Sequence, residues 1–157
     1  MLVDLTRQLF FSRQGRISRA TWWTGIGGLV VWNIVVFLVL WSIFGQSLVL
    51  NFFGRLIATC VTALNIYASY CLSAKRFQDR NRSALNAKIV AAVWAAKALL
   101  DLVRITDNPV PNTLDQLFIL AGTGLGLWYF IELGWMEGTR GRNDYGDDPL
   151  DTAARSG

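Results

Sequence analysis

The side chains of this chain that could do chemistry are mainly arginines and carboxylates. The 157 residues include no histidine and only two cysteines, which removes the commonest general base and the commonest metal ligand. Cys60 and Cys71 would lie about 16 Å apart along one helix, too far for a disulfide. No serine or cysteine has a recognisable base, and no cluster of metal ligands is present. We therefore expect no enzyme activity, no cofactor and no metal site.

Much of the charge lies in three short segments. These are FSRQGRISRATWW (residues 11–23), AKRFQDRNRSA (residues 74–84) and GTRGRNDYGDDP (residues 138–149). Because an arginine fork matches both carboxylate and phosphate, two interpretations stay open. The arginines either bind the acidic residues of the third segment or bind an anionic lipid headgroup or another phosphate ligand. The candidates for ligand binding are Arg16, Arg19, Arg76 and Arg82.

The first interpretation predicts a polar cap at one end of the molecule. We expect Asp79 and Asp148 each to be held by an arginine. Asn143 and Gly146 suit a tight turn, and Pro149 would fix the exit from that turn. Trp23 and Tyr145 complete the candidates for this cap. Nucleic acid is not expected as a partner, because the positive charge lies at predicted helix ends and a net-acidic stretch follows.

Long apolar runs separate the charged segments and must position them. Thr24–Phe44 has 21 residues without a charge and Leu56–Ala74 has 19. At a rise of about 1.5 Å per residue, each run spans roughly the 30 Å hydrocarbon core of a bilayer. The sequence thus predicts an all-α, integral membrane four-helix bundle forming one domain over residues 1–157. The expected helices cover about 22–44, 56–74, 88–104 and 115–136, between an N-terminal segment (1–21) and a tail (137–157).

The basic residues also predict an orientation. All but three of the 15 lysines and arginines lie in the N-terminal segment, in the 75–88 loop or in the C-terminal tail. The positive-inside rule therefore places both termini and this loop in the cytoplasm, which four spans allow and three or five do not. Residues 1–12 are expected to form a short helix on the membrane surface, with a frayed terminus as the alternative.

Three charged side chains fall within the predicted helices away from their first and last residues. Lys97 and Asp101 share a face of the third helix, since they lie four residues apart. They form either a self-neutralising pair or a polar stripe that lines a site or an ion path. Glu132, near the end of the fourth helix, is expected to pair with a basic residue of the middle loop such as Lys88 or Arg76.

The three charged segments together resemble the bacterial membrane family known as domain of unknown function 805. The family has a glycine-arginine-x-serine-arginine entry followed by an aromatic pair, then a loop with arginine and aspartate, and a glycine- and aspartate-proline-containing tail. One position departs from the pattern, because Gln78 stands where the family usually has histidine. The matching residues are Gly15, Arg16, Ser18, Arg19 and Trp23, then Arg76, Asp79, Arg82 and Ser83, then Gly141, Asn143, Tyr145, Gly146, Asp148 and Pro149.

The resemblance implies a bacterial inner-membrane protein but no activity. We expect a non-enzymatic, multi-pass module whose cytoplasmic cap contacts anionic lipid or a protein partner, with a homo-oligomer as a further alternative. The runner-up is a small transporter or channel subunit that uses the Lys97 and Asp101 face of the third helix.

Overall fold

The computed structural model describes residues 2–46, 51–106 and 110–151. Over these ranges the chain is helical, and its only β-type pairing is an isolated bridge between Asn143 and Gly146. The predicted all-α class is therefore confirmed for the described residues. In chain order the elements are α1 (Leu2–Phe11), α2 (Arg19–Phe44), α4 (Phe52–Asp79), α5 (Leu85–Leu102), α6 (Thr113–Tyr129) and the π-helix η1 (Phe130–Trp135).

Capping residues explain where two of the helices begin. The side chain of Ser18 accepts a hydrogen bond from the backbone N–H of Thr21 at 3.2 Å, so α2 begins three residues before its predicted start. At α6, Asn112 and Asp115 form a reciprocal capping box. Each of these caps satisfies backbone N–H groups that a helix start leaves without a partner.

The helix α4 is longer at both ends than the 56–74 predicted from its uncharged run. It continues through the charged residues to Asp79, and Asn81 then takes a positive φ of 54°. The prediction stopped at Ala74 because a charged residue usually leaves the hydrocarbon. Here the side chains of Lys75, Arg76 and Asp79 are buried and bonded to other parts of the chain.

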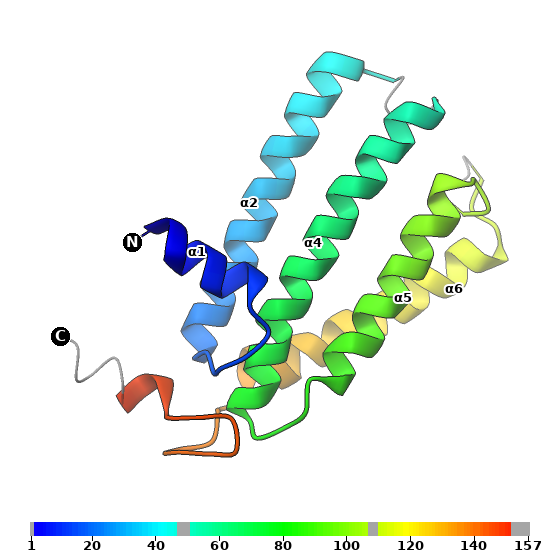
Figure 1. Cartoon of the computed structure of the whole chain (residues 1–157). Coiled ribbons are helices and arrows are strands. Elements are labelled where there is room, and N and C mark those ends of the chain that lie inside the picture. The colour runs from blue at the N-terminus through cyan, green and yellow to red at the C-terminus, as the bar shows by residue number, and fades with distance from the viewer. Residues whose placement is uncertain (1, 47–50, 107–109, 152–157) are drawn as a thin grey trace.

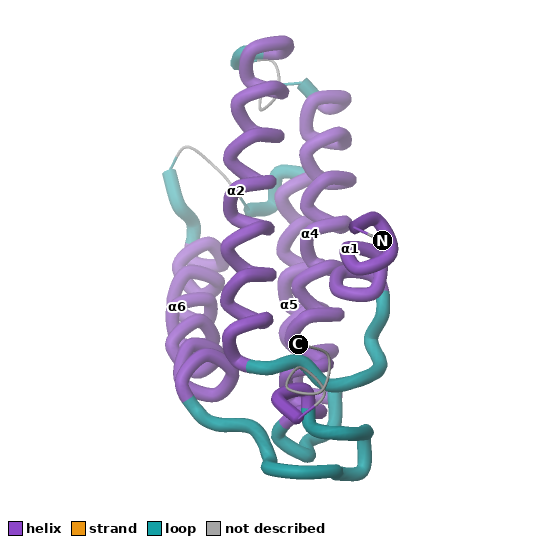
Figure 2. Tube along the Cα trace, turned by 90° about the vertical axis from the view of Figure 1, so that its left-hand side faces the viewer, coloured by secondary structure: helices purple, strands orange, loops and turns teal. Residues whose placement is uncertain are grey.

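Figures 1 and 2 show α2, α4 and α5 running side by side in alternating directions, with α6 at an angle to them. The most extensive packing joins α4 to α5, while α6 contacts α2 and α4 mainly through its continuation η1. α1 packs across α4, so the predicted N-terminal helix exists and lies against the bundle. The main buried cluster includes Trp22, Leu72, Phe77 and Leu133, close to the end of the bundle where the charged segments meet.

Three helices are long and apolar enough to cross a membrane: Arg19–Phe44, Phe52–Asp79 and Thr113–Trp135. Their apolar side chains face outward, as in Val31 (62% exposed) and Leu120 (72% exposed), which is the arrangement of a helix surrounded by lipid. Helix α5 is not among the three, because Lys88, Lys97 and Asp101 all fall within its 18 residues. The fourth predicted span therefore stays a prediction.

Candidate functional site

The three charged segments lie together at one end of the bundle (Figure 1). We call this region the cap and define it as residues 12–18, 80–84 and 136–151 with the helix ends that they join. Hydrogen bonds link the first segment to the third and the second to the third. The three segments therefore meet at one end of the molecule, as expected.

The carboxylate of Asp79, the last residue of α4, is the centre of the cap. Its Oδ1 accepts a hydrogen bond from Nε of Arg16 at 3.1 Å, and its Oδ2 pairs with Nη1 of Arg76. All three side chains are at most 4% exposed. The expectation that an arginine holds Asp79 is thus met twice. A buried carboxylate between two arginines is a strong structural device, because removing it leaves two buried charges without their counter-ion.

The Arg16 guanidinium is fully engaged within the protein. Besides Asp79, it donates from Nη1 to the carbonyl oxygens of Gly141 (2.6 Å) and Gly146 (3.0 Å), and from Nη2 to that of Thr139 (2.5 Å). An arginine has five N–H donors, and these four bonds use every nitrogen of the side chain. Arg16 therefore ties the tail to α4, and the predicted role in ligand binding does not fit its buried position.

Arg76 is engaged in the same way at the end of the last helix. Its Nε donates to the carbonyl of Leu133 at 2.9 Å, and its Nη2 donates to the carbonyl of Met136. With Nη1 on Asp79, each nitrogen has a partner inside the molecule. The side chain is 1% exposed, so Arg76 is also a structural residue of the cap.

The carbonyl groups that Arg76 binds are free to accept these bonds because they lie at the end of the π-helix η1. A helix end leaves its final carbonyl groups without intrahelical partners, and they carry partial negative charge. Three more side chains donate hydrogen bonds to carbonyl groups of η1. Trp23 Nε1 donates to Gly134 O at 3.1 Å, Arg19 Nη1 to Trp135 O at 2.7 Å, and Arg80 Nη1 to Glu132 O at 2.9 Å. The carbonyls of residues 132–136 are therefore bound by donors from α2 and from the end of α4.

The tail is fastened to the end of α4 by a second set of bonds. The backbone N–H and the hydroxyl of Thr139 both donate to Asp79 O, at 2.9 and 2.7 Å. Nδ2 of Asn143 donates to Gln78 O at 3.0 Å. Asn143 and Gly146 exchange backbone hydrogen bonds across a tight turn, in which Gly146 has a φ of 130° that favours glycine. Tyr145 follows in this turn with its N–H on Asn143 Oδ1.

Asp148 closes the tail through its own carboxylate. The oxygens accept hydrogen bonds from the backbone N–H groups of Gly141 and Leu150, each at 2.9 Å. These two bonds, with the nearby Arg16, lower the pKa of Asp148 below its ordinary value. Pro149 follows at the first position of a helical turn, so Asp148 and Pro149 have the arrangement of an N-cap followed by proline.

Glu132 is buried in η1 and pairs with basic residues of the middle loop, as expected, but its partners are not the named examples Lys88 and Arg76. Its carboxylate forms ion pairs with Arg80 and, at 2.7 Å, with Arg82. The reason is that α4 extends further than expected, which carries Arg76 under η1 and presents Arg80 at the level of Glu132. The middle loop does supply the basic partners, but through different residues.

The Lys97–Asp101 pair of α5 is local, because both residues lie on one helix. Nζ of Lys97 lies 2.8 Å from both carboxylate oxygens of Asp101, and the hydroxyl of Thr106 donates to the same carboxylate. Lys97 also lies 5.9 Å from the ring centroid of Phe118 on α6. This geometry matches the self-neutralising interpretation, in which the two charges reduce each other's cost in hydrocarbon.

Two of the four arginines predicted to bind a ligand keep exposed donors. Arg19 uses one nitrogen on Trp135 O, and its other donors have no partner within the described residues. Arg82 is 52% exposed at its side chain. Arg19 lies in a surface groove with three exposed aromatic residues, Trp23, Phe130 and Trp135, which are 42%, 47% and 69% exposed. We call these four residues the Arg19 groove.

The sequence did not single out two further residues that hold the cap. Nζ of Lys75 donates to the carbonyls of Gln8 and Leu9, at 2.6 Å each, and so caps the C-terminal turn of α1. Gly138 lies so close to Asp79 that an added Cβ would be 2.0 Å from Oδ2.

These observations describe a small helical protein that has three helices long and apolar enough to cross a membrane and one end joined by arginine and carboxylate bonds. The chain belongs to the family described as "Protein of unknown function (DUF805)", whose sequence profile matches residues 10–147. The "Uncharacterized protein YiiR" of Escherichia coli strain K12 is 30% identical over 147 residues, which cover 92% of this chain and 90% of that protein. YiiR of E. coli O157:H7 matches equally. No solved structure matches the chain.

Proposed function

We propose that this chain is a non-enzymatic module of the bacterial inner membrane that binds anionic lipid headgroups in the Arg19 groove. The observation that carries the proposal is the division among the four candidate arginines. Arg16 and Arg76 are buried and satisfied, whereas Arg19 keeps exposed donors beside aromatic side chains. Tryptophan and arginine together favour the headgroup level of a bilayer, where an apolar ring and a charged group can both be accommodated.

Chemistry and position both favour a phosphodiester in this groove. The guanidinium of Arg19 can bind two phosphate oxygens, and Trp23 and Trp135 would flank the glycerol and upper acyl region. The backbone contact to Trp135 O orients the Arg19 side chain toward the aromatic residues before lipid arrives. Arg82 lies on the same cap and is a second, weaker candidate, because Glu132 already neutralises part of its charge.

One test compares Arg19→Ala with Arg142→Ala. Arg142 is a matched control, because it is a cap arginine that is 83% exposed at its side chain and lines no pocket with Arg19. We expect Arg19→Ala to lower retention of phosphatidylglycerol about fivefold, since one basic residue contributes about 1 kcal/mol near an anionic surface. Native mass spectrometry of the detergent-solubilised protein would measure bound phosphatidylglycerol against phosphatidylcholine. Equal retention by both variants, or no preference for the anionic lipid in the parent protein, contradicts the proposal.

The proposed topology has four spans with both termini in the cytoplasm. Its support is the gathering of the basic segments at the cap, together with the course of α5, which runs from the cap beside α4 toward the opposite end (Figure 1). The pairing of Lys97 with Asp101 lowers the cost of placing α5 within the bilayer. If α5 did not cross the bilayer, α6 would have to start on the cap side of the membrane, although its far end, η1, is the end that lies at the cap.

Cysteine labelling tests this topology directly. In a background with Cys60→Ala and Cys71→Ala, single cysteines replace Gln46, Val110 or Asp144. Intact inner-membrane vesicles of known orientation are then treated with a membrane-impermeant maleimide. We expect Asp144→Cys to react only from the cytoplasmic side, and Gln46→Cys and Val110→Cys only from the other side. Reaction of Val110→Cys and Asp144→Cys from one side would overturn the four-span arrangement.

A protein partner or a second copy of the chain is a further proposal for the cap, and nucleic acid is not proposed. The transport alternative has less support than lipid binding. Lys97 and Asp101 are bonded to each other on one helix, and neither lines the cavity that lies between the helices.

A further inference from the structure

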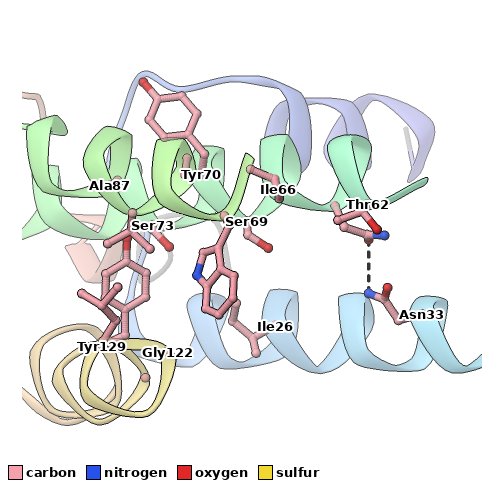
Figure 3. Close-up of a pocket in the computed structure, with 16 residues that line it drawn as sticks. Ile26, Asn33, Thr62, Ile66, Ser69, Tyr70, Ser73, Ala87, Gly122 and Tyr129 are labelled. Atoms are coloured by element: carbon pink, nitrogen blue, oxygen red, sulfur yellow. Dashed lines mark hydrogen bonds between the residues drawn. The ribbon is translucent and has the colours of Figure 1, made fainter. Parts of the chain in front are cut away.

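A cavity of about 320 Å³ lies between α2, α4, α5 and α6. Figure 3 shows Ile26 and Asn33 of α2 opposite Thr62 and Ser69 of α4, with Tyr129 and Gly122 of α6 nearby. This volume falls in the range of small-molecule sites. None of the lining residues is charged, so an ion or a charged substrate would find no counter-charge there.

The hydroxyl groups on α4 are the informative feature of the cavity. A serine or threonine within a helix can donate to a carbonyl three or four residues earlier. Elsewhere in this chain Thr24, Ser42 and Thr123 do so, at 2.9, 2.8 and 2.9 Å. Among the described residues, no such bond is made by Thr62 or Ser69, which both line the cavity. Their hydroxyls are therefore available to a ligand.

The amide groups of the cavity play a different part. Asn33 Nδ2 donates to Leu29 O at 2.7 Å and to Asn65 Oδ1 at 3.2 Å, and Asn65 Nδ2 donates to Val61 O at 2.9 Å. These bonds join α2 to α4, as polar groups do within a bilayer. With the amides engaged in this way, the hydroxyls of Thr62 and Ser69 are the polar groups available to a ligand.

The remaining wall is apolar and aromatic. Trp94 of α5 packs against the backbone of α6 at Gly122, where an added Cβ would lie 2.8 Å from the indole. One turn further, Gly126 also lines the cavity, but a Cβ there would meet nothing within 4 Å. Trp94 therefore fills the space beside Gly122, whereas no side chain fills the space beside Gly126.

We propose that this cavity binds the uncharged, carbonyl-bearing headgroup of a lipid-soluble molecule. The carbonyl oxygen accepts hydrogen bonds from Thr62 and Ser69, while Trp94 packs against the apolar body of the headgroup. Two classes of membrane compound that carry such carbonyl groups are the prenylated quinones, in their ring, and the neutral diacylglycerols, in their ester groups. The inference is independent of the Arg19 groove, which lies at the cap.

The test uses full-length protein in detergent with two probes, decylubiquinone and dioctanoylglycerol. Binding is measured as ligand-dependent thermal stabilisation for both probes, and for the quinone also as quenching of tryptophan fluorescence. Saturable binding of either probe supports the proposal and identifies the source of the carbonyl. Absence of saturable binding for both probes overturns it.

Two pairs of variants locate the site. Gly126→Leu should fill the cavity and lower affinity at least about tenfold, whereas Gly124→Leu, on the same helix but outside the cavity and also in open space, should not. Thr62→Val with Ser69→Ala should lower affinity about fivefold through two lost hydrogen bonds, while Thr123→Val should leave it unchanged. Equal affinity of the Thr62/Ser69 variant and the Thr123 control would overturn the proposal even if Gly126→Leu does not fold.

Discussion

Replacing Asp79 with alanine is expected to destabilise the protein by about 3–5 kcal/mol, because Arg16 and Arg76 would remain buried without their shared carboxylate. The same change removes the side chain to which the tail and the first segment are both linked through arginines. The expected result is a lower midpoint of thermal unfolding in detergent, followed by tryptophan fluorescence, and faster cleavage of the tail by trypsin. Asp79→Asn should show a smaller loss, since the amide keeps one acceptor oxygen.

The matched control for this experiment is Asp147→Ala. Asp147 belongs to the same cap and faces an arginine, but its side chain is 78% exposed and lies 3.9 Å from Arg142. Exposed pairs of this kind contribute little to stability, so the control should unfold within about 0.5 kcal/mol of the parent. If the two alanine variants were equally stable, the central role of Asp79 in the cap would be refuted.

Gly138→Ala is expected to cost about 1–3 kcal/mol, because the new methyl group has no room. Its Cβ would lie 2.0 Å from Oδ2 and 2.7 Å from Cγ of Asp79, which two arginines hold in place. The chain can relieve this contact only by moving the tail away from α4 or by breaking an arginine bond. Limited proteolysis of the tail and the unfolding midpoint in detergent would both report the change.

Gly124→Ala provides a control with the opposite expected sign. It lies within α6 and has open space at the position of the added Cβ. Alanine is favoured over glycine inside a helix by about 0.5–1 kcal/mol, so this variant should be slightly more stable than the parent. A Gly138→Ala protein that matched Gly124→Ala in stability and in tail protection would show that the tail does not pack against Asp79.

The helices could be predicted because long uncharged runs are a local property of the sequence. The runs at Thr24–Phe44 and Leu56–Ala74 lie within α2 and α4. The helix ends were less predictable, because burial of Lys75 and Arg76 depends on acceptors at Gln8, Leu9, Leu133 and Met136, which are distant in sequence. A rule that ends each helix at its first charged residue therefore ended α4 too early.

The candidate site was predictable in its parts but not in its pairs. The three charged segments and Asp79 were identified from residue types, and family membership followed from the same motifs. The choice between a structural and a ligand-binding arginine depends on burial, which places Arg16 and Arg76 inside and Arg19 outside. The cavity was missed for a related reason, since Thr62 and Ser69 look like ordinary helix residues until their missing carbonyl bonds are seen.

The cap can form only after the tail has been synthesised, because its bonds join early residues of the chain to late ones. Arg16 finds its carbonyl acceptors at Thr139, Gly141 and Gly146, near the end of the chain. During synthesis the Arg16 guanidinium is therefore made long before these acceptors exist. Only after residues 139–146 have left the ribosome can it form these bonds, so a product truncated before Thr139 would keep residues 12–18 without these bonds and accessible to proteases.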